Sequence, residues 1–240
     1  MSKVSSNHPQ KPPAAIAPNG VSRPGWLEIV VGLVVFAIIG FVGVSQLKRL
    51  GLDPGVYGLI LTSWTGVATL IAFAMAARLR IRSLSAFGVR STSARWLPIG
   101  VGVGLVAFVL KGLAILAWIE VTGDTNNVQD VYADGARGGL LSLVLSMVFL
   151  TVFSPFGEEL LYRGIVTNAL LRYGPFVGVV GSTVIFALMH GINYTFPAAV
   201  VAGLATAEIF RRSESIWPGF VVHVVFNLPS FLLVVFTSTG

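Results

Sequence analysis

The feature that most constrains this chain is an uncharged apolar run that ends in a cluster of charged residues. The run extends from Leu140 to Phe156, and Glu158, Glu159 and Arg163 follow within seven residues of its end. An apolar stretch of about 17 or more residues is long enough to form a membrane-spanning helix. Ionisable residues are costly inside such a helix and therefore indicate a functional site. We expect the chemistry of this protein to be located around these charged side chains.

The spacing of the cluster predicts which charged groups are paired. If the helix continues to Arg172, Glu159 and Arg163 stand at i and i+4 on one face, where opposite charges can interact. Glu158 points about 100° away from Glu159, so it has no such local partner. We expect a supporting pair next to one carboxylate that is left for chemistry.

The composition identifies the class of protein. The chain of 240 residues is 55% hydrophobic and only 11% charged, with a mean hydropathy of +0.84, values far outside those of soluble domains. The absence of cysteine excludes disulfides, thiolate metal sites and cysteine nucleophiles. We predict an all-α polytopic membrane protein with one helical bundle.

The hydropathy pattern predicts about seven transmembrane helices. Residues 1–25 are polar and rich in proline, and are expected to form a disordered cytoplasmic tail. Residues 26–137 are expected to form a transmembrane scaffold, and residues 138–240 the core that carries the functional motifs. The predicted spans cover roughly residues 27–47, 56–77, 96–121, 139–172, 176–190, 196–210 and 216–236.

The basic residues predict the orientation of the bundle in the membrane. With seven spans, eleven Lys and Arg residues lie on the side of the N-terminus and three on the other side. Cytoplasmic loops carry the excess of Lys and Arg, so the N-terminus is expected in the cytoplasm. Because the net charge of +6 is explained by topology, we expect the lipid bilayer, and no nucleic acid, as the partner of these residues.

Other polar features have structural interpretations. Lys111 lies well inside the third span, where we favour pairing with an acidic group across the bundle over a catalytic role. The basic segment 78–95 fits an amphipathic stretch at the lipid headgroups or a connecting loop equally well. Segment 122–137 is expected to be a loop that faces water. Glu208 and Arg212 are expected to form an i,i+4 pair.

Two histidines and an asparagine on later spans could meet Glu158 in the membrane interior if the helices tilt or start irregularly. Glu158 and His190 are each about 21 Å from the cytoplasmic end of their helices, and His223 and Asn227 about 10 and 16 Å. A carboxylate in a low-dielectric site next to a second carboxylate is a suitable general base for water. The imidazoles and the amide supply donors for a developing oxyanion. This set of groups fits amide hydrolysis without a side-chain nucleophile.

Two other interpretations fit the same residues. Glu158, His190 and His223 are candidate ligands of a divalent metal with an open position for water, although the HExxH string of soluble zinc proteases is absent. Buried ionisable groups also occur in transporters and in bundles that bind ions. From the residues alone, catalysis and transport remain equally supported.

Three short motifs stand in a defined order on successive apolar spans. Each motif is weak by itself, but the ordered set is specific. The motifs are Glu158-Glu159-x-x-x-Arg163, Phe186-x-x-x-His190 and His223-x-x-x-Asn227.

This ordered set resembles the CAAX protease and bacteriocin-processing family of intramembrane endopeptidases, which is all-helical. The resemblance implies an endopeptidase that hydrolyses a peptide bond near the membrane by means of water activated by a glutamate. It assigns water activation to Glu158, support of the site to Glu159 and Arg163, water holding to His190, and oxyanion stabilisation to His223 and Asn227.

The resemblance also defines the range of possible substrates and cofactors. Eukaryotic members remove the last three residues of prenylated CAAX proteins, and bacterial members have suggested roles in processing of, or immunity to, bacteriocin-like peptides. We therefore expect a multi-pass protein of a bacterial plasma membrane that acts on a prenylated or bacteriocin-like peptide or protein. The cofactor is either Zn²⁺ or none, and we favour none because Asn227 is a poor zinc ligand. The alternative is an inactive bacteriocin-immunity protein or an ion- or solute-binding membrane protein.

Overall fold

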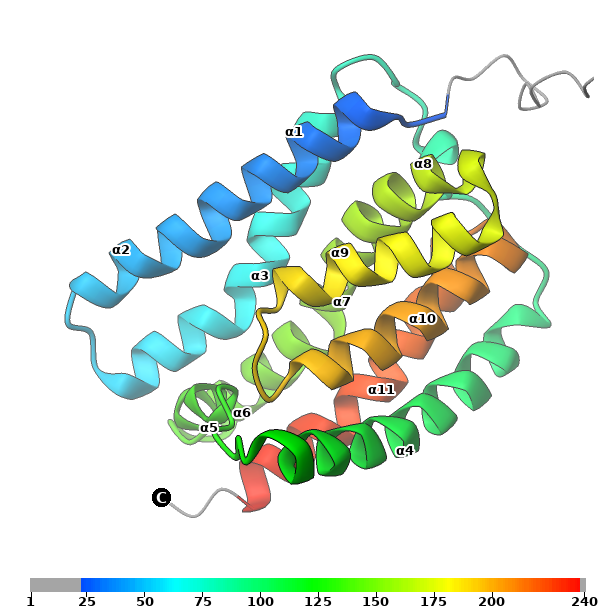
Figure 1. Cartoon of the computed structure of the whole chain (residues 1–240). Helices are drawn as coiled ribbons and strands as arrows, with labels where there is room; N and C mark the ends of the chain where they lie inside the picture. Colours follow the sequence, from blue (N-terminus) through cyan, green and yellow to red (C-terminus); the bar gives the residue numbers. More distant parts are fainter. Residues whose placement is uncertain (1–22, 238–240) are drawn as a thin grey trace, which may run out of the picture.

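The chain folds into a bundle of helices (Figure 1). The structure, a computed structural model, describes residues 23–237, and within this range it contains helices and no strand. Residues 1–22 of the predicted cytoplasmic tail lie outside the described residues. Five helices are long and apolar enough to cross a membrane, which confirms the prediction of an all-helical integral membrane protein. They are Trp26–Arg49, Pro54–Ala77 (α3), Trp96–Thr122 (α4), Leu140–Tyr173 and Ile216–Phe236, the last lying within α11 (Ile216–Thr237).

The other two predicted spans are shorter helices. Residues Val177–Met189 form one apolar helix, made of a π-helical start, η6 (Val177–Gly181), and α9 (Ser182–Met189). The second is α10 (Phe196–Ser213). The count of seven spans therefore stays a prediction. The first long helix is also composite, with the segments α1 (Trp26–Ala37), η1 (Ile38–Gly43) and α2 (Val44–Arg49).

The helix that carries the glutamates changes its hydrogen-bond register repeatedly. Pro155 has no N–H to donate and its ring clashes with the preceding turn, and the π-helical segment before it accommodates this defect. A second π-helical segment begins directly at Glu159. The successive segments are α6 (Leu140–Val148), η3 (Phe149–Phe153), α7 (Ser154–Glu158), η4 (Glu159–Thr167), α8 (Asn168–Leu170) and η5 (Leu171–Tyr173).

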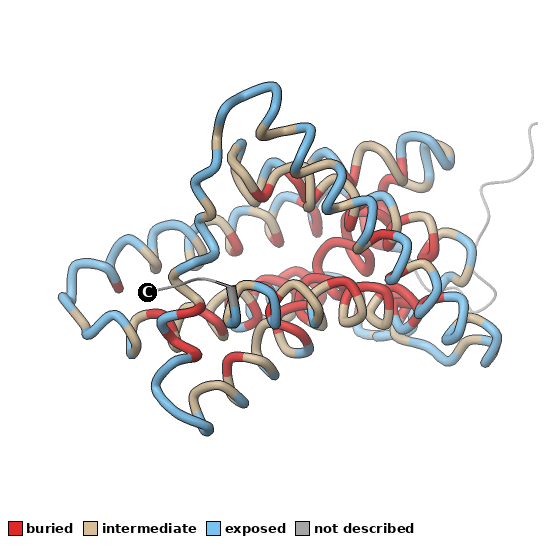
Figure 2. The backbone as a smooth tube through the Cα atoms, turned by 90° about the horizontal axis from the view of Figure 1, so that it is seen from below, coloured by how far each residue is buried: buried red, intermediate tan, exposed pale blue. Residues whose placement is uncertain are grey.

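Segment η4 lies at the centre of the molecule. All of its residues, from Glu159 to Thr167, are buried, and Figure 2 shows the buried backbone concentrated in the middle of the bundle. α3 packs against α1 and α7 on one side, and α4 packs against α10 and α11 on the other. The charged cluster that follows the apolar run is therefore inside protein on all sides, as the cost of ionisable groups in lipid requires.

The basic segment 78–95 is a connecting loop with one short 3₁₀ turn, η2 (Leu84–Phe87). Two ion pairs attach it to the bundle: Arg80 contacts the fully buried Glu28 at 2.7 Å, and Arg90 contacts Glu214 at 2.5 Å. Phe87 is fully buried below the turn. Of the two interpretations left open by the sequence, the structure supports the loop.

Segment 122–137 differs from the expected water-facing loop. It contains a helix, α5 (Asp130–Ala136), whose small residues Ala133, Gly135 and Ala136 are buried. α5 packs against α3 so closely that a Cβ on Gly58 would lie 2.4 Å from the carbonyl oxygen of Val131. The prediction of an open loop was wrong for this part, because a run of small residues allowed backbone-to-backbone contact that hydropathy alone does not reveal.

Candidate active site

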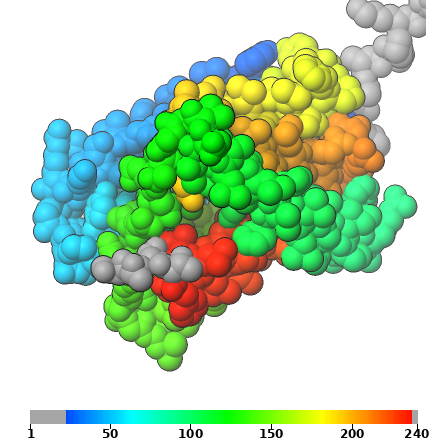
Figure 3. Space-filling model, turned by 60° about the horizontal axis from the view of Figure 1, so that its bottom comes forward, coloured from blue at the N-terminus to red at the C-terminus, as the bar shows by residue number. Residues whose placement is uncertain are grey.

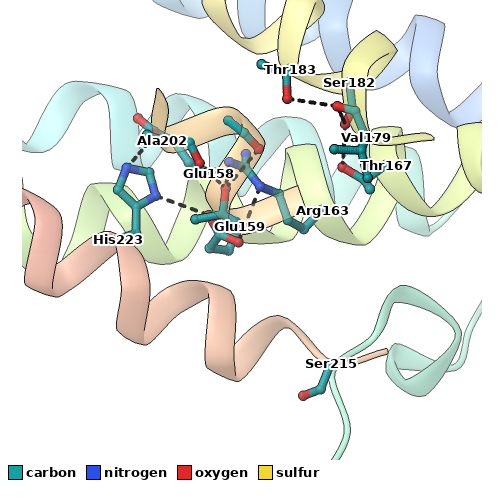
Figure 4. A network of polar contacts seen from close by, with 12 residues as sticks. Glu158, Glu159, Arg163, Thr167, Val179, Ser182, Thr183, Ala202, Ser215 and His223 are labelled. Carbon is teal, nitrogen blue, oxygen red and sulfur yellow. Dashed lines mark hydrogen bonds and ion pairs between the residues drawn. The ribbon is translucent and has the colours of Figure 1, made fainter. Parts of the chain in front are cut away.

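The two adjacent glutamates and His223 form the centre of the site (Figure 4). The Nδ1 atom of His223 lies 3.1 Å from Oε1 of Glu159, and its Nε2 atom lies 3.5 Å from Oε2 of Glu158. All three residues are buried, with relative exposures of 4% for His223, 0% for Glu159 and 6% for Glu158. α11 thus presents an imidazole to two carboxylates at the junction of α7 and η4.

The predicted pair of Glu159 and Arg163 is present. Nε of Arg163 lies 3.5 Å from Oε2 of Glu159, and Nη2 donates a hydrogen bond to Oγ1 of Thr206 on α10. The guanidinium also lies over the ring of Phe186, 4.6 Å from its centroid. The cation is held by three other side chains, from three helical segments. Removing it would leave the buried Glu159 carboxylate without its counter-charge.

These contacts determine how His223 can act. An ionised carboxylate only accepts hydrogen bonds, so Nδ1 carries the proton that faces an ionised Glu159. This hydrogen bond fixes the ring and directs Nε2 towards Glu158, as a second partner commonly does for functional histidines. Nε2 then accepts a hydrogen bond when the ring is neutral and donates one when the ring is protonated.

His190 and Asn227 share one cavity with Glu158 and His223. The cavity has a volume of about 140 Å³ and is lined by all four residues. Nδ1 of His190 donates to the carbonyl oxygen of Phe186 at 2.8 Å, which leaves its Nε2 atom for another partner. Nδ2 of Asn227 donates to the carbonyl oxygen of Leu150 at 3.2 Å. An amide carries two N–H donors, so a second one is available.

The structure therefore brings the predicted site residues to one place in two groups. Glu158, Glu159, Arg163 and His223 are linked by direct contacts. His190 and Asn227 line the same cavity, and each donates a hydrogen bond to a backbone carbonyl group. The role of each residue in the chemistry stays a prediction.

Several residues that line the cavity lie outside the motifs. Tyr132 of α5 is the most informative, because burial raises the pKa of its hydroxyl to about 12 and the neighbouring Glu158 carboxylate adds to this rise. A neutral hydroxyl next to the carboxylate can donate a hydrogen bond. No motif points to Tyr132, which reaches the site only because α5 folds back onto α3. The other such residues are Thr65, Gln129, Leu150, Ser154, Thr195, Ala198, Ala199, Ala202 and Phe226.

The candidate metal ligands do not form a common site in this conformation. Within residues 23–237, no group of three His, Asp or Glu side chains is arranged to hold a metal ion. Glu158 and His223 face each other, but His190 does not complete a three-ligand set with them.

The bundle is that of a polytopic membrane protein with a buried cluster of carboxylates and an imidazole among its helices. Residues 140–229 match the family described as type II CAAX prenyl endopeptidase, Rce1-like. This match covers all three motifs and supports the CAAX protease family that they resemble. The family consists of membrane-embedded proteases that act on peptide or protein substrates. No curated protein and no solved structure matches the chain.

Proposed function

We propose that this protein is an intramembrane endopeptidase in which Glu158 activates the water that hydrolyses the peptide bond. The observation that carries the proposal is the contact of His223 with Glu158 and Glu159 next to a cavity, within the segment that matches the protease family. The cavity provides room for water and a peptide carbonyl group, and among the ion pairs of the described residues the carboxylate that faces it has His223, and no Lys or Arg, as its partner.

In the proposed reaction, Glu158 takes a proton from water and the resulting hydroxide forms a bond to the carbonyl carbon. The negative charge that develops on the carbonyl oxygen is stabilised by N–H donors of Asn227 and of protonated His223. The carbon–nitrogen bond then breaks, and Glu158 returns the proton to the leaving amine. Glu159 and Arg163 hold His223 in the required orientation, and His190 helps to position the water.

The reaction as proposed requires no metal. The lining of the cavity favours this version, because Asn227 is a hydrogen-bond donor rather than a typical zinc ligand. If zinc is present, Glu158, His190 and His223 are its candidate ligands, and a rearrangement of His190 would be needed.

The proposed topology and substrate follow from the family match and from the distribution of basic residues along the chain. We propose seven spans, with α9 and α10 crossing the membrane as shorter helices between the two longest core helices, and with the N-terminus in the cytoplasm of a bacterium. The substrate is a prenylated or bacteriocin-like peptide or protein.

The test compares purified wild type with Glu158→Gln on a panel of prenylated CAAX peptides and bacteriocin-like precursors. Gln keeps the shape of the side chain and removes the base, so turnover should fall by a factor on the order of a hundred or more while the peptide still binds. Glu120→Gln, an exposed residue at the end of α4, is the matched control and should retain full activity.

Undiminished cleavage by Glu158→Gln would remove this residue from the mechanism. If wild type cleaves no member of the panel but moves an ion or solute across liposome membranes, the protein is a transporter and the proposal is wrong.

A further inference from the structure

The cavity that contains the glutamates continues towards the end of the bundle where α5 lies. A second cavity of about 70 Å³ adjoins it, and follows the last turns of α11 as far as Val235. Gln129, the residue before α5, lines both cavities and is exposed, so the shared part of the two cavities reaches the surface there. Figure 3 shows this face, where the green segment with α5 lies beside the red end of α11. The residues common to both cavities are Gln129, Tyr132, Leu150 and Asn227.

The opposite side of the site is closed by packed side chains. Every residue of η4 is buried, and Phe87 and Ile216 are fully buried. The backbone N–H of Ile216 donates a hydrogen bond to the carbonyl oxygen of Gly88 at 3.0 Å, and a Cβ on Gly164 would lie 2.9 Å from the carbonyl oxygen of Phe87. The loop 78–95 thus seals this end of the bundle, and a peptide reaches the glutamates from the side of α5.

Lys111 indicates that the open side is accessible to water. Its expected acidic partner is not found, because each ion pair between the described residues involves arginine or histidine as the positive group. The ammonium group instead donates a hydrogen bond to Oγ of Ser230, which lines the second cavity. A charged side chain inside a spanning helix is tolerated where it faces a water-filled cavity. The second cavity can supply this water.

The basic residues assign the two ends of the bundle to the two sides of the membrane. Ion pairs of Arg80 with Glu28 and of Arg90 with Glu214 attach the basic loop to the closed end. Cytoplasmic loops carry the excess of Lys and Arg, so in the proposed orientation the closed end faces the cytoplasm and the open end faces outwards. Between residues 23 and 237, the closed end carries Arg23, Arg78, Arg80, Arg82, Arg90, Arg95, Arg172, Arg211 and Arg212, and the open end carries Lys48, Arg49 and Arg137.

We infer that the substrate enters the site from the extracytoplasmic side, and that the enzyme acts on peptide segments exposed at the outer surface of the membrane. The inference rests on the proposed endopeptidase function and orientation, and it narrows the class of substrate. Exported peptides and the outer loops or tails of membrane proteins can reach the opening at Gln129. A C-terminus that stays in the cytoplasm meets the closed end and is not cleaved.

The test places single cysteines in the full chain, which has none of its own. Ala198→Cys puts a thiol in the wall of the cavity, outside the proposed catalytic residues, and Gln129→Cys puts one at the opening. Ser85→Cys, exposed in the basic loop, is the matched control for the opposite side. Labelling by a charged, membrane-impermeant maleimide is compared between intact cells and inside-out vesicles. This measurement does not depend on turnover.

Ala198→Cys and Gln129→Cys should be labelled in intact cells, and Ser85→Cys only in inside-out vesicles. A membrane-impermeant library of internally quenched peptides is then offered to one side of the membrane at a time. Right-side-out vesicles with wild type should cleave it. Inside-out vesicles with wild type should show no more cleavage than vesicles with Glu158→Gln.

Labelling of Ala198→Cys from the side of Ser85→Cys, or from neither side, would overturn the inferred entry route, and so would labelling of Gln129→Cys from the cytoplasmic side. Cleavage in inside-out vesicles that equals or exceeds cleavage in right-side-out vesicles would overturn the substrate class. If the labelling is as expected but wild type cleaves no peptide from either side or in detergent, the entry route stands and the proposed endopeptidase function fails.

Discussion

Gly219 gives a direct way to disturb the proposed active site of Glu158, Glu159 and His223 without removing any of its charged groups. This residue lies in the first turn of α11, and a Cβ atom placed on it would be 2.6 Å from Oε2 of Glu159. Glu159 is fully buried, with its other oxygen held by His223. In Gly219→Ala the carboxylate must therefore move away from α11, and its contacts with His223 and Arg163 must lengthen.

The expected effect on stability is small, and the effect on activity is larger. Alanine in a helix is favoured over glycine by about 1 kcal/mol, whereas weakening a hydrogen bond to a charged group costs about 1.5–3 kcal/mol. Together, the two effects lower the free energy of unfolding by about 0.5–2 kcal/mol. For activity, a displacement of about 1 Å in a catalytic group lowers the rate by about a hundredfold, and His223 loses the contact that orients its ring.

The measurement combines turnover with thermal unfolding of the purified variants. Gly219→Ala should lose between tenfold and a hundredfold of kcat, by the same reasoning, and unfold close to the wild-type temperature. Gly112→Ala introduces the same methyl group on α4, where no atom lies within 4 Å, and should retain wild-type turnover. Full activity of Gly219→Ala would show that the position of the Glu159 carboxylate does not matter for catalysis and would refute the role assigned to it.

Three further predictions test the support of the site, the cofactor and the topology. Arg163→Ala leaves the Glu159 carboxylate buried without its cation and should destabilise the fold by about 3–5 kcal/mol, with loss of activity; an unchanged unfolding midpoint would make the pair incidental. Elemental analysis of active wild type should find no stoichiometric metal, and one zinc per chain, lost with activity on chelation and restored with it, would contradict the metal-free reaction. A reporter inserted near Ser83 should be cytoplasmic and one fused after Gly240 extracytoplasmic, and the opposite pattern would reverse the proposed orientation.

The parts of the site that could be predicted are those encoded by spacing within one helix or by the order of the helices. Glu159 and Arg163 are four residues apart, so their pairing follows from helical geometry. The depths of Glu158 and His223 within their spans made a meeting in the membrane interior possible. The match to the protease family over residues 140–229 confirms the resemblance that the ordered motifs indicated.

Contacts that depend on how helices are placed against each other could not be predicted. The hydrogen bond of His223 to Glu159 requires the approach of α11 at Gly219, and nothing in the local pattern indicates which carboxylate the imidazole contacts. Tyr132 reaches the cavity because α5 is seated on α3 through Gly58 and Gly135. An isolated polar segment with a tyrosine does not reveal this packing, so the segment was interpreted as a loop facing water.

The two π-helical segments on either side of α7 make the length of this helix as important as its composition. Each π-helical turn contains an additional residue relative to an α-helix, so the direction in which Glu158 points depends on the number of residues between Leu140 and Pro155. If Phe149–Phe153 became α-helical without losing a residue, the additional residue would rotate the following segment by about 100°. Glu158 would then face away from His223. Relatives of this protein are expected to vary freely in the apolar side chains of this stretch while keeping its number of residues constant.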